Sequence, residues 1–317
     1  MIERVTERAA ITHMAPGRWH TAGLLTVPPL MWAGNAIVGR LMVGQVSPLL
    51  LNFLRWVLVV AILLPLARRA LHPWSRIRTR WAYLAAVGVL GVGLYNALQY
   101  TALVTSSPIN VTLVAASMPV WMLAVGALFF GEKPSPRQLV GAALGLAGVL
   151  MVIGRGSWQT LVQVQFVVGD MLVIAAAIGW AFYSWLLARP PSHMQGAARP
   201  AQWDWAGFLL IQALFGLLAA GSFAAGEAAL GLAQVDWSLG TVAALVYVSL
   251  GASIAAYRCW GLGVAAGGPA LAAMFGNLTP LFAAVLSMMV LGDAPRPYHA
   301  VAFVFIVAGI AVTARGR

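Results

Sequence analysis

The sequence predicts an all-α polytopic membrane protein whose ten transmembrane helices form two inverted five-helix repeats. Three observations predict this fold class: the composition, the distribution of the basic residues, and an internal repeat. Of the 317 residues, 61% are hydrophobic and 9% are charged, whereas charged residues make up roughly 25% of an ordinary soluble domain. A soluble protein of this length could not cover its surface with so few charges.

Ten apolar stretches are long enough to cross a bilayer, which takes about 20 residues of helix. Residues 1–19 precede the first of them and lack the apolar core and cleavage site of a signal peptide, so we expect a cytoplasmic tail. The transmembrane helices are expected near residues 20–40, 48–66, 81–102, 107–130, 137–154, 166–187, 204–226, 239–262, 268–291 and 297–314.

The 19 Lys and Arg residues are distributed unevenly between the two ends of these helices. If the N-terminus is cytoplasmic, fourteen fall in inner segments, two (Arg155 and Arg296) in outer loops, and three (Arg40, Arg55 and Arg258) within helices. Cytoplasmic segments of membrane proteins carry the excess of Lys and Arg, so both termini are predicted to be cytoplasmic. The topology thus explains the net charge of +11. We expect the chain to contact the lipid bilayer and to bind no nucleic acid.

The second half of the chain repeats the first, which divides it into five-helix repeats at 20–155 and 166–317. An odd number of crossings makes the second copy enter from the opposite face, so the halves are inverted. One match, at an offset of 148, sets the Trp-Ala pair at Trp32 against that at Trp180. Matches at an offset of 161 pair Pro108 with Pro269, Pro119 with Pro280, Gly131 with Gly292, Glu132 with Asp293, Pro134 with Pro295, Pro136 with Pro297 and Gly148 with Gly309.

These repeated motifs resemble the drug/metabolite transporter superfamily, in its EamA-type group. The resemblance rests on the two Trp-Ala pairs, the helix-centre prolines, and the Gly-acid turns that precede Gly-rich helices, and it covers nearly the whole chain. It implies a basket of helices 1 to 4 and 6 to 9 around a central cavity, with helices 5 and 10 outside. Within the group the chain is most similar to bacterial exporters of aromatic amino acids, although the motifs report the fold more than the cargo.

Four Trp residues lie deep in the expected membrane: Trp32, Trp121, Trp180 and Trp260. Seven others fall at helix ends, where Trp is common in membrane proteins for reasons unconnected with a substrate. Trp32 and Trp180 are related by the repeat, so rings from both halves could sandwich an aromatic or bulky apolar cargo. Plain core packing is the alternative.

Polar and aromatic side chains form stripes on the third and eighth helices. The third helix carries them on one broad face near mid-depth, where hydrocarbon would penalise polar groups: Tyr95, Asn96, Gln99 and Tyr100. On the repeat-related eighth helix, Ser253, Tyr257 and Trp260 form a similar stripe at spacings of four and seven residues. The two stripes could converge on one substrate cavity, or they could supply hydrogen bonds between helices.

Prolines interrupt the fourth helix at Pro108 and Pro119 and the ninth helix at Pro269 and Pro280. A proline inside a helix frees a carbonyl group and kinks the axis. Their symmetric placement favours a role as hinges or gates for alternating access, with static kinks as the alternative.

Few charges are expected inside the membrane. Arg55 is seven residues into the second helix, roughly 10 Å deep at 1.5 Å per residue. It could hold a substrate carboxylate, or it could bond Asn52 and exposed carbonyl groups. No Asp, Glu or His is expected near the bilayer centre, where proton relays depend on such residues, and this favours a facilitator or a carrier whose coupling the sequence does not display.

The sequence contains no pattern typical of an enzyme or of a cofactor site. The single Cys259 and the scattered His residues lack metal-ligand spacing, and no phosphate-binding or dinucleotide fingerprint occurs. We therefore expect no catalytic residues, metal or cofactor.

The sequence and the resemblance together predict a secondary transporter, a facilitator or exporter of small metabolites that works by alternating access in the bacterial inner membrane. Aromatic and large neutral amino acids are the expected cargo. A carrier of anionic or phosphorylated metabolites and an efflux pump for lipophilic drugs are the alternatives. A polytopic membrane enzyme would need a nucleophile or an acid–base pair at the interface, and the sequence shows none.

Overall fold

The computed structural model describes residues 17–102, 105–106, 111, 114–291 and 296–315, and the secondary-structure elements of this part of the chain are all helices. The α-helices are α1 (Arg18–Leu41), α2 (Pro48–Ala67), α3 (Trp74–Arg78), α4 (Trp81–Gly88), α5 (Tyr95–Ala102), α7 (Met118–Phe129), α8 (Pro136–Ile153), α9 (Trp158–Val162), α10 (Val168–Ala188), α11 (Trp205–Ala229), α12 (Leu239–Ser249), α13 (Ala256–Gly276), α14 (Thr279–Leu291) and α15 (Pro297–Ala314). Two π-helices, η3 (Val89–Leu94) and η6 (Leu250–Ala255), join α4 to α5 and α12 to α13, and three short 3-10 helices lie in connections, η2 (Arg68–Leu71), η4 (Ser192–Met194) and η5 (Gly196–Ala198).

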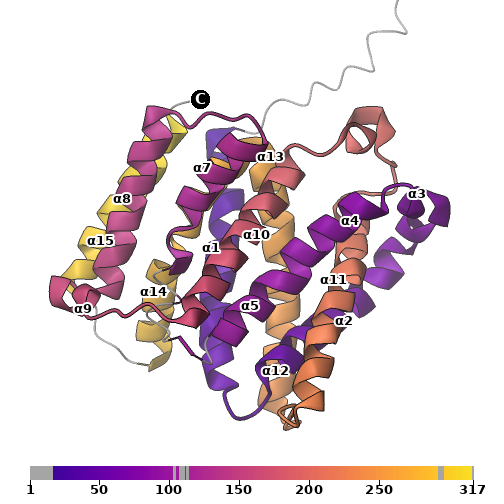
Figure 1. Ribbon diagram of the computed structural model, residues 1–317, viewed down its shortest axis with the longest axis horizontal. Coiled ribbons are helices and arrows are strands. Elements are labelled where there is room, and N and C mark those ends of the chain that lie inside the picture. The colour runs from indigo at the N-terminus through magenta and orange to yellow at the C-terminus, as the bar shows by residue number, and fades with distance from the viewer. Residues whose placement is uncertain (1–16, 103–104, 107–110, 112–113, 292–295, 316–317) are drawn as a thin grey trace, which may run out of the picture.

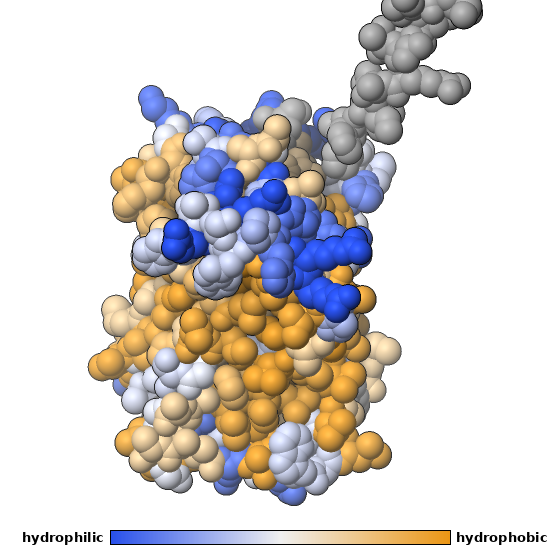
Figure 2. Space-filling model, turned by 90° about the vertical axis from the view of Figure 1, so that its right-hand side faces the viewer, coloured by the Kyte–Doolittle hydropathy of each residue, from blue (hydrophilic) through white to orange (hydrophobic). Residues whose placement is uncertain are grey.

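Eight helical runs among the described residues are long and apolar enough to cross a membrane, and α7 is a shorter apolar helix. Together with the family described below, they make the chain a polytopic, all-helical membrane protein. Figure 2 agrees with this view: on the face shown, hydrophilic residues gather toward one end, above a broad hydrophobic band. The eight runs are residues 18–39, 48–71, 81–99, 136–153, 168–188, 205–229, 239–276 and 297–314.

One run differs from the expected boundaries. Residues expected to end the eighth helix and begin the ninth are continuous, so the run of residues 239–276 is 38 residues long. It bends at Gly268, whose φ of 67° lies in the left-handed region that favours glycine, and Pro269 follows immediately. The bend therefore marks the expected boundary, although no loop separates the two segments.

The helices are arranged around α1, α10 and α13, with α8 and α15 side by side at one edge and α2 and α11 toward the other (Figure 1). The contact between α8 and α15 depends on glycine, because an added Cβ at Gly141 would lie 2.7 Å from the carbonyl oxygen of Gly309. Small residues of this kind let two membrane helices approach closely. The glycine-rich face of α8 is thus covered by α15.

Two irregular features recur at the repeat offset of 161 residues. The π-helix η6 begins at Leu250, and η3 begins 161 residues earlier, at Val89. Helix α14 begins at Thr279, and α7 begins 161 residues earlier, at Met118. A two-residue turn precedes each of these two starts, at 116–117 and 277–278.

Two buried carboxylates hold helix N-termini at the end of the molecule opposite α3. Glu227 accepts hydrogen bonds from the Ser47 hydroxyl and from the backbone N–H groups of Leu49 and Leu50, in the first turn of α2. Asp170 accepts from the Ser106 hydroxyl and, at 2.8 Å, from a backbone N–H at the start of α10. Negative charge is stabilised at a helix N-terminus, so both acids have structural partners.

Candidate functional site

Aromatic rings from several helices meet at the centre of the bundle, and Trp180 lies in their middle. Its ring centroid is 5.4 Å from those of Trp32, Tyr95 and Trp260, and 5.6 Å from that of Tyr257. Trp32 and Trp260 also touch, at 5.4 Å. Most of these pairs are tilted or edge-on, the arrangements that aromatic quadrupoles favour. We call these five rings, together with Tyr183, the ring cluster.

The ring cluster draws on both halves of the sequence: Trp32 from α1, Tyr95 from α5, Trp180 and Tyr183 from α10, and Tyr257 and Trp260 from α13. The sequence predicted five of these six residues as substrate-binding candidates, and the structure brings them together. Their rings pack against one another, with Trp180 4% exposed and Trp260 1% exposed. The structure therefore presents a closed cluster of rings at this point.

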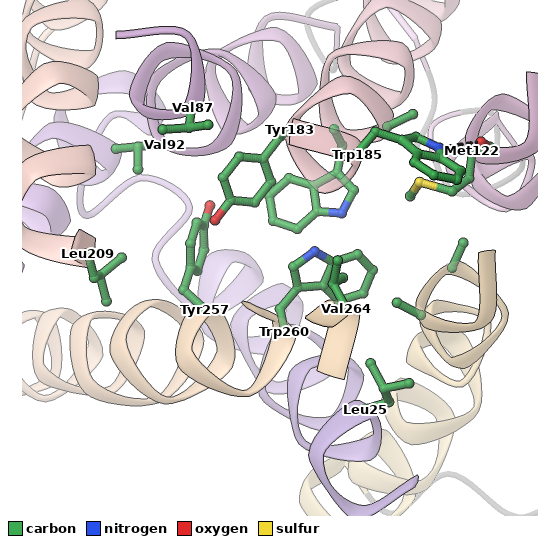
Figure 3. Packing of buried hydrophobic residues seen from close by; sticks show 14 of the residues in the cluster. Leu25, Val87, Val92, Met122, Tyr183, Trp185, Leu209, Tyr257, Trp260 and Val264 are labelled. Carbon is green, nitrogen blue, oxygen red and sulfur yellow. Dashed lines mark hydrogen bonds between the residues drawn. The ribbon is translucent and has the colours of Figure 1, made fainter. Parts of the chain in front are cut away.

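Three residues at or beside the ring cluster were not predicted from the sequence: Tyr183, Ser184 and Trp56. Tyr183 is 5.0 Å from Trp180 and 6.1 Å from Tyr257 between ring centroids, and the two tyrosine hydroxyls point toward each other (Figure 3). Ser184 accepts a hydrogen bond from Trp260 Nε1 at 3.2 Å. Tyr183 and Ser184 follow Trp180 by three and four residues, so the helical period places all three on one face. This spacing was the signal that could have identified them.

The two π-helices supply backbone acceptors to the ring cluster. Tyr257 donates its hydroxyl to the carbonyl oxygen of Gly91 in η3. Trp32 Nε1 donates to the carbonyl oxygen of Ala252 in η6 at 3.2 Å. Gly91 and Ala252 are 161 residues apart, so each half offers a carbonyl group at the same repeat position. π-Helical turns in helices frequently occur at functional sites.

The polar stripe of the third helix borders the same region. Asn96 is buried, and Gln99 is half-buried. Among the described residues, neither side-chain amide has a hydrogen-bond partner. Neither amide is among the buried polar atoms that lack a partner, so both retain accessible surface and are free to bind another molecule.

Two groups of predicted site residues lie apart from the ring cluster. Trp121 donates a 2.8 Å hydrogen bond to Ser117, in the turn before its own helix, and has no ring contact with the cluster in the described part of the chain. Pro119 and Pro280 each occupy the second position of a helix, α7 and α14, rather than a helix interior. A proline is tolerated in a first turn because its missing N–H would be unpaired there.

Of the remaining two prolines, the structure describes Pro269 but not Pro108. Pro269 follows the bend at Gly268 and is buried. Pro108 lies outside the described residues, as do Gly292, Asp293 and Pro295 of the repeat. In the described chain, helices are thus interrupted before α7 and α14 and at Gly268.

Arg55 of α2 is 3% exposed and lies beside the ring cluster. Its Nε donates to Ser253 Oγ at 2.5 Å, and its Nη2 donates to the Ala252 carbonyl oxygen at 3.0 Å. The partners are therefore residues of η6, and not Asn52, whose Oδ1 is buried without a partner.

A cavity of about 270 Å³ lies nearer the end of the molecule at which α10 ends. Val264 lines it one helical turn after Trp260, and Trp185 lines it five residues after Trp180. At the same place Arg189 forms an ion pair with Glu132, which links the segment after α7 to the end of α10. No group of three or more possible metal ligands occurs in the part of the chain that the structure describes.

Comparison with known proteins decides the family. The model of the EamA-like transporter family matches this chain twice, over residues 21–154 and 167–315. The chain belongs to the EamA-like transporter family. The expected resemblance is thereby confirmed, and the EamA-like family and the relatives below are transporters rather than enzymes.

Curated relatives of this EamA-like chain are transporters of low sequence identity. An uncharacterized transporter of Archaeoglobus fulgidus is 27% identical over 92% of this chain and 96% of its own length. The aromatic amino acid exporter YddG of Ancylobacter novellus is 26% identical over 89% and 93%. A probable amino-acid metabolite efflux pump of Escherichia coli is 26% identical over 73% and 74%. A solved crystal structure, 24% identical, has the same fold with a TM-score of 0.73 and covers 95% of this chain and 99% of its own.

Proposed function

We propose that this EamA-like transporter exports aromatic and large neutral amino acids across the bacterial inner membrane. The observation that carries the proposal is the ring cluster, in which rings from both halves of the chain meet. Asn96 and Gln99, whose side-chain amides have no partner among the described residues, follow Tyr95 on α5. An aromatic side chain could take the place of one ring contact, since each such contact contributes about 0.5–1.5 kcal/mol beyond area burial. Asn96 and Gln99 offer donors and acceptors for the polar end of the same molecule.

We further propose that the chain crosses the membrane ten times, as two inverted halves at 20–155 and 166–317. The matching offsets of η3 with η6 and of α7 with α14 support a structural repeat with the same period as the sequence repeat. The bend at Gly268 supports a division of the 38-residue run into two crossings. With an odd number of helices in each half, the second half runs in the opposite direction through the bilayer.

Alternating access follows from this architecture. The ring cluster is closed, whereas the cavity at Arg189 and Glu132 begins about one helical turn away. We propose that the cavity is the inner part of the pathway and that the ring cluster opens toward it in one state. Because α7 and α14 both restart at a break with a proline in the first turn, these breaks are the proposed hinges.

A carrier of anionic metabolites is the second candidate, and the buried guanidinium of Arg55 favours it. Efflux of lipophilic drugs is the third candidate. It requires only an apolar cluster of rings and gives no role to Asn96 and Gln99.

Counterflow in proteoliposomes separates the three. Vesicles that contain the purified full-length protein are loaded with one unlabelled compound, and uptake of labelled L-tryptophan is measured. We expect stimulated uptake with internal tryptophan, phenylalanine or leucine, and none with a sugar phosphate or a lipophilic cation. Stimulation by the sugar phosphate alone, or by the cation alone, would reject the amino-acid assignment, and protein-free vesicles are the control.

A further inference from the structure

Arg55 is a positive charge buried within the bundle. Arg side chains keep their charge inside proteins, and the transfer of a charge out of water is costly unless a partner compensates for it. Within the described residues, the salt bridge found is that of Arg189 with Glu132, and no carboxylate pairs with Arg55. Glu227, the acid that contacts the start of the same helix, is engaged by Ser47 and two backbone N–H groups.

The guanidinium has unused capacity to donate. Nε and Nη2 bond Ser253 and Ala252, and Nη1 has no hydrogen-bond partner among the described residues. Both partners are neutral, so they satisfy hydrogen bonding without neutralising the charge. An anion with two oxygens is the complement that a guanidinium fork binds best.

The position of Arg55 links this charge to the ring cluster. Its Nη2 shares the carbonyl oxygen of Ala252 with Trp32 Nε1, so the guanidinium and the indole are neighbours. The guanidinium also lies 5.3 Å over the ring of Trp56, whose centroid is 5.2 Å from that of Tyr257. A molecule among these rings would therefore be close to the charge.

We propose that Arg55 binds the carboxylate of the transported amino acid while the side chain of that amino acid packs among Trp32, Trp180 and Trp260. This assignment rests on the proposed function. In an aromatic amino acid, the α and β carbons alone separate the carboxylate from the ring, so one molecule can reach both groups. Arg55 then makes the transporter select carboxylates over amides and amines of the same shape.

A purely structural role makes a different prediction. If Arg55 only holds α2 to η6, its loss lowers stability and turnover for every substrate alike. Carboxylate binding instead changes the ratio between two substrates that differ only in the carboxylate. A ratio measured within one variant is independent of the amount of folded protein.

The test compares L-tryptophan with L-tryptophanamide as competitors of labelled tryptophan counterflow in proteoliposomes. For the wild type we expect tryptophan to compete about 10- to 100-fold better than the amide, because hydrogen bonds to charged groups are the strong ones. Arg55→Gln should reduce this ratio to near one, and Arg55→Lys should keep part of it. Arg258→Gln is the matched control: Arg258 is exposed and lies 4.5 Å over the ring of Trp205, so the wild-type ratio should be kept.

Two results would overturn the inference: an Arg55→Gln variant that retains the wild-type ratio, or a wild type that is inhibited equally by tryptophan and its amide. The comparison of tryptophan with its amide in the wild type needs no variant, and Arg55→Lys keeps the positive charge. The inference therefore stays testable even if Arg55→Gln folds poorly. Failure of the proposed function is distinct, because the wild type would then show no counterflow with any aromatic amino acid.

Discussion

At the scale of single residues, Trp180 organises the centre of the molecule. It contacts rings from α1, α5, α10 and α13, whereas the equally buried Trp203 serves a local purpose by donating its Nε1 to the Ala70 carbonyl oxygen at 2.8 Å. The two tryptophans therefore offer a matched pair of the same size and burial. Substituting each of them in turn distinguishes a role in substrate recognition from a role in core packing.

We expect Trp180→Ala and Trp203→Ala each to destabilise the protein by about 3–5 kcal/mol, because both create a large internal cavity. Only Trp180→Ala should also weaken the binding of tryptophan, by roughly tenfold, since it removes ring contacts. Thermal unfolding in detergent and concentration-dependent counterflow measure the two effects. Equal affinities for the two variants would identify the ring cluster as ordinary core.

The residues of the site were only partly predictable from the sequence. Trp32 and Trp180 could be matched because each begins a repeated Trp-Ala pair, and the spacing on α13 placed Tyr257 and Trp260 on one face. Tyr183 and Ser184 follow Trp180 at helical spacing, but the direction in which that face points depends on how α10 packs. The partners of Arg55 depend on η6, and nothing in the pattern of apolar residues distinguishes a π-helical turn from an α-helical one.

At the scale of elements, the interruptions of the helices matter more than their lengths. Pro119 and Pro280 lie in the first turns of α7 and α14, directly after turns at 116–117 and 277–278. The sequence located the prolines as interruptions, but it placed them inside the expected helices at 107–130 and 268–291 because apolar residues extend on both sides. A proline disfavours helical continuation toward the N-terminus and so helps to preserve the break, although α1 continues through Pro28 and Pro29.

We expect Pro119→Ala and Pro280→Ala to slow turnover severalfold and to leave tryptophan affinity nearly unchanged. Alanine allows the helix to extend across the break, which stiffens the proposed hinge without altering the ring cluster. Initial rates and half-saturation in counterflow distinguish the two effects, and Pro136→Ala, in the first turn of α8 without such a break, is the control. Loss of affinity with normal turnover would assign these prolines to binding.

At the scale of the whole molecule, basic residues mark one end. Arg137 at the start of α8 donates to the carbonyl oxygen of Arg315 just after α15, and Figure 1 shows α3 at the same end and α9 at the other. The distribution of Lys and Arg between the expected helices predicts that this end is cytoplasmic, since topology follows the Lys and Arg residues of short segments. The side of the membrane that this end faces stays a prediction.

We predict that the end with α3 faces the cytoplasm. In a Cys259→Ala background, Ser157→Cys, beside α9, should react with a membrane-impermeant thiol reagent added to intact cells. Ser192→Cys, in the connection between α10 and α11, should react only after the membrane is permeabilised. The reverse pattern would invert the proposed topology.

The central claim is that the ring cluster opens to hold the ring of an amino acid. A cryo-electron microscopy structure of the full-length protein in lipid nanodiscs with L-tryptophan tests it most directly. We expect bound tryptophan between Trp32 and Trp180, with these two rings farther apart than 5.4 Å and the ligand carboxylate toward Arg55. Tryptophan bound only in the cavity beside Arg189, with the ring cluster closed as it is here, would contradict the claim.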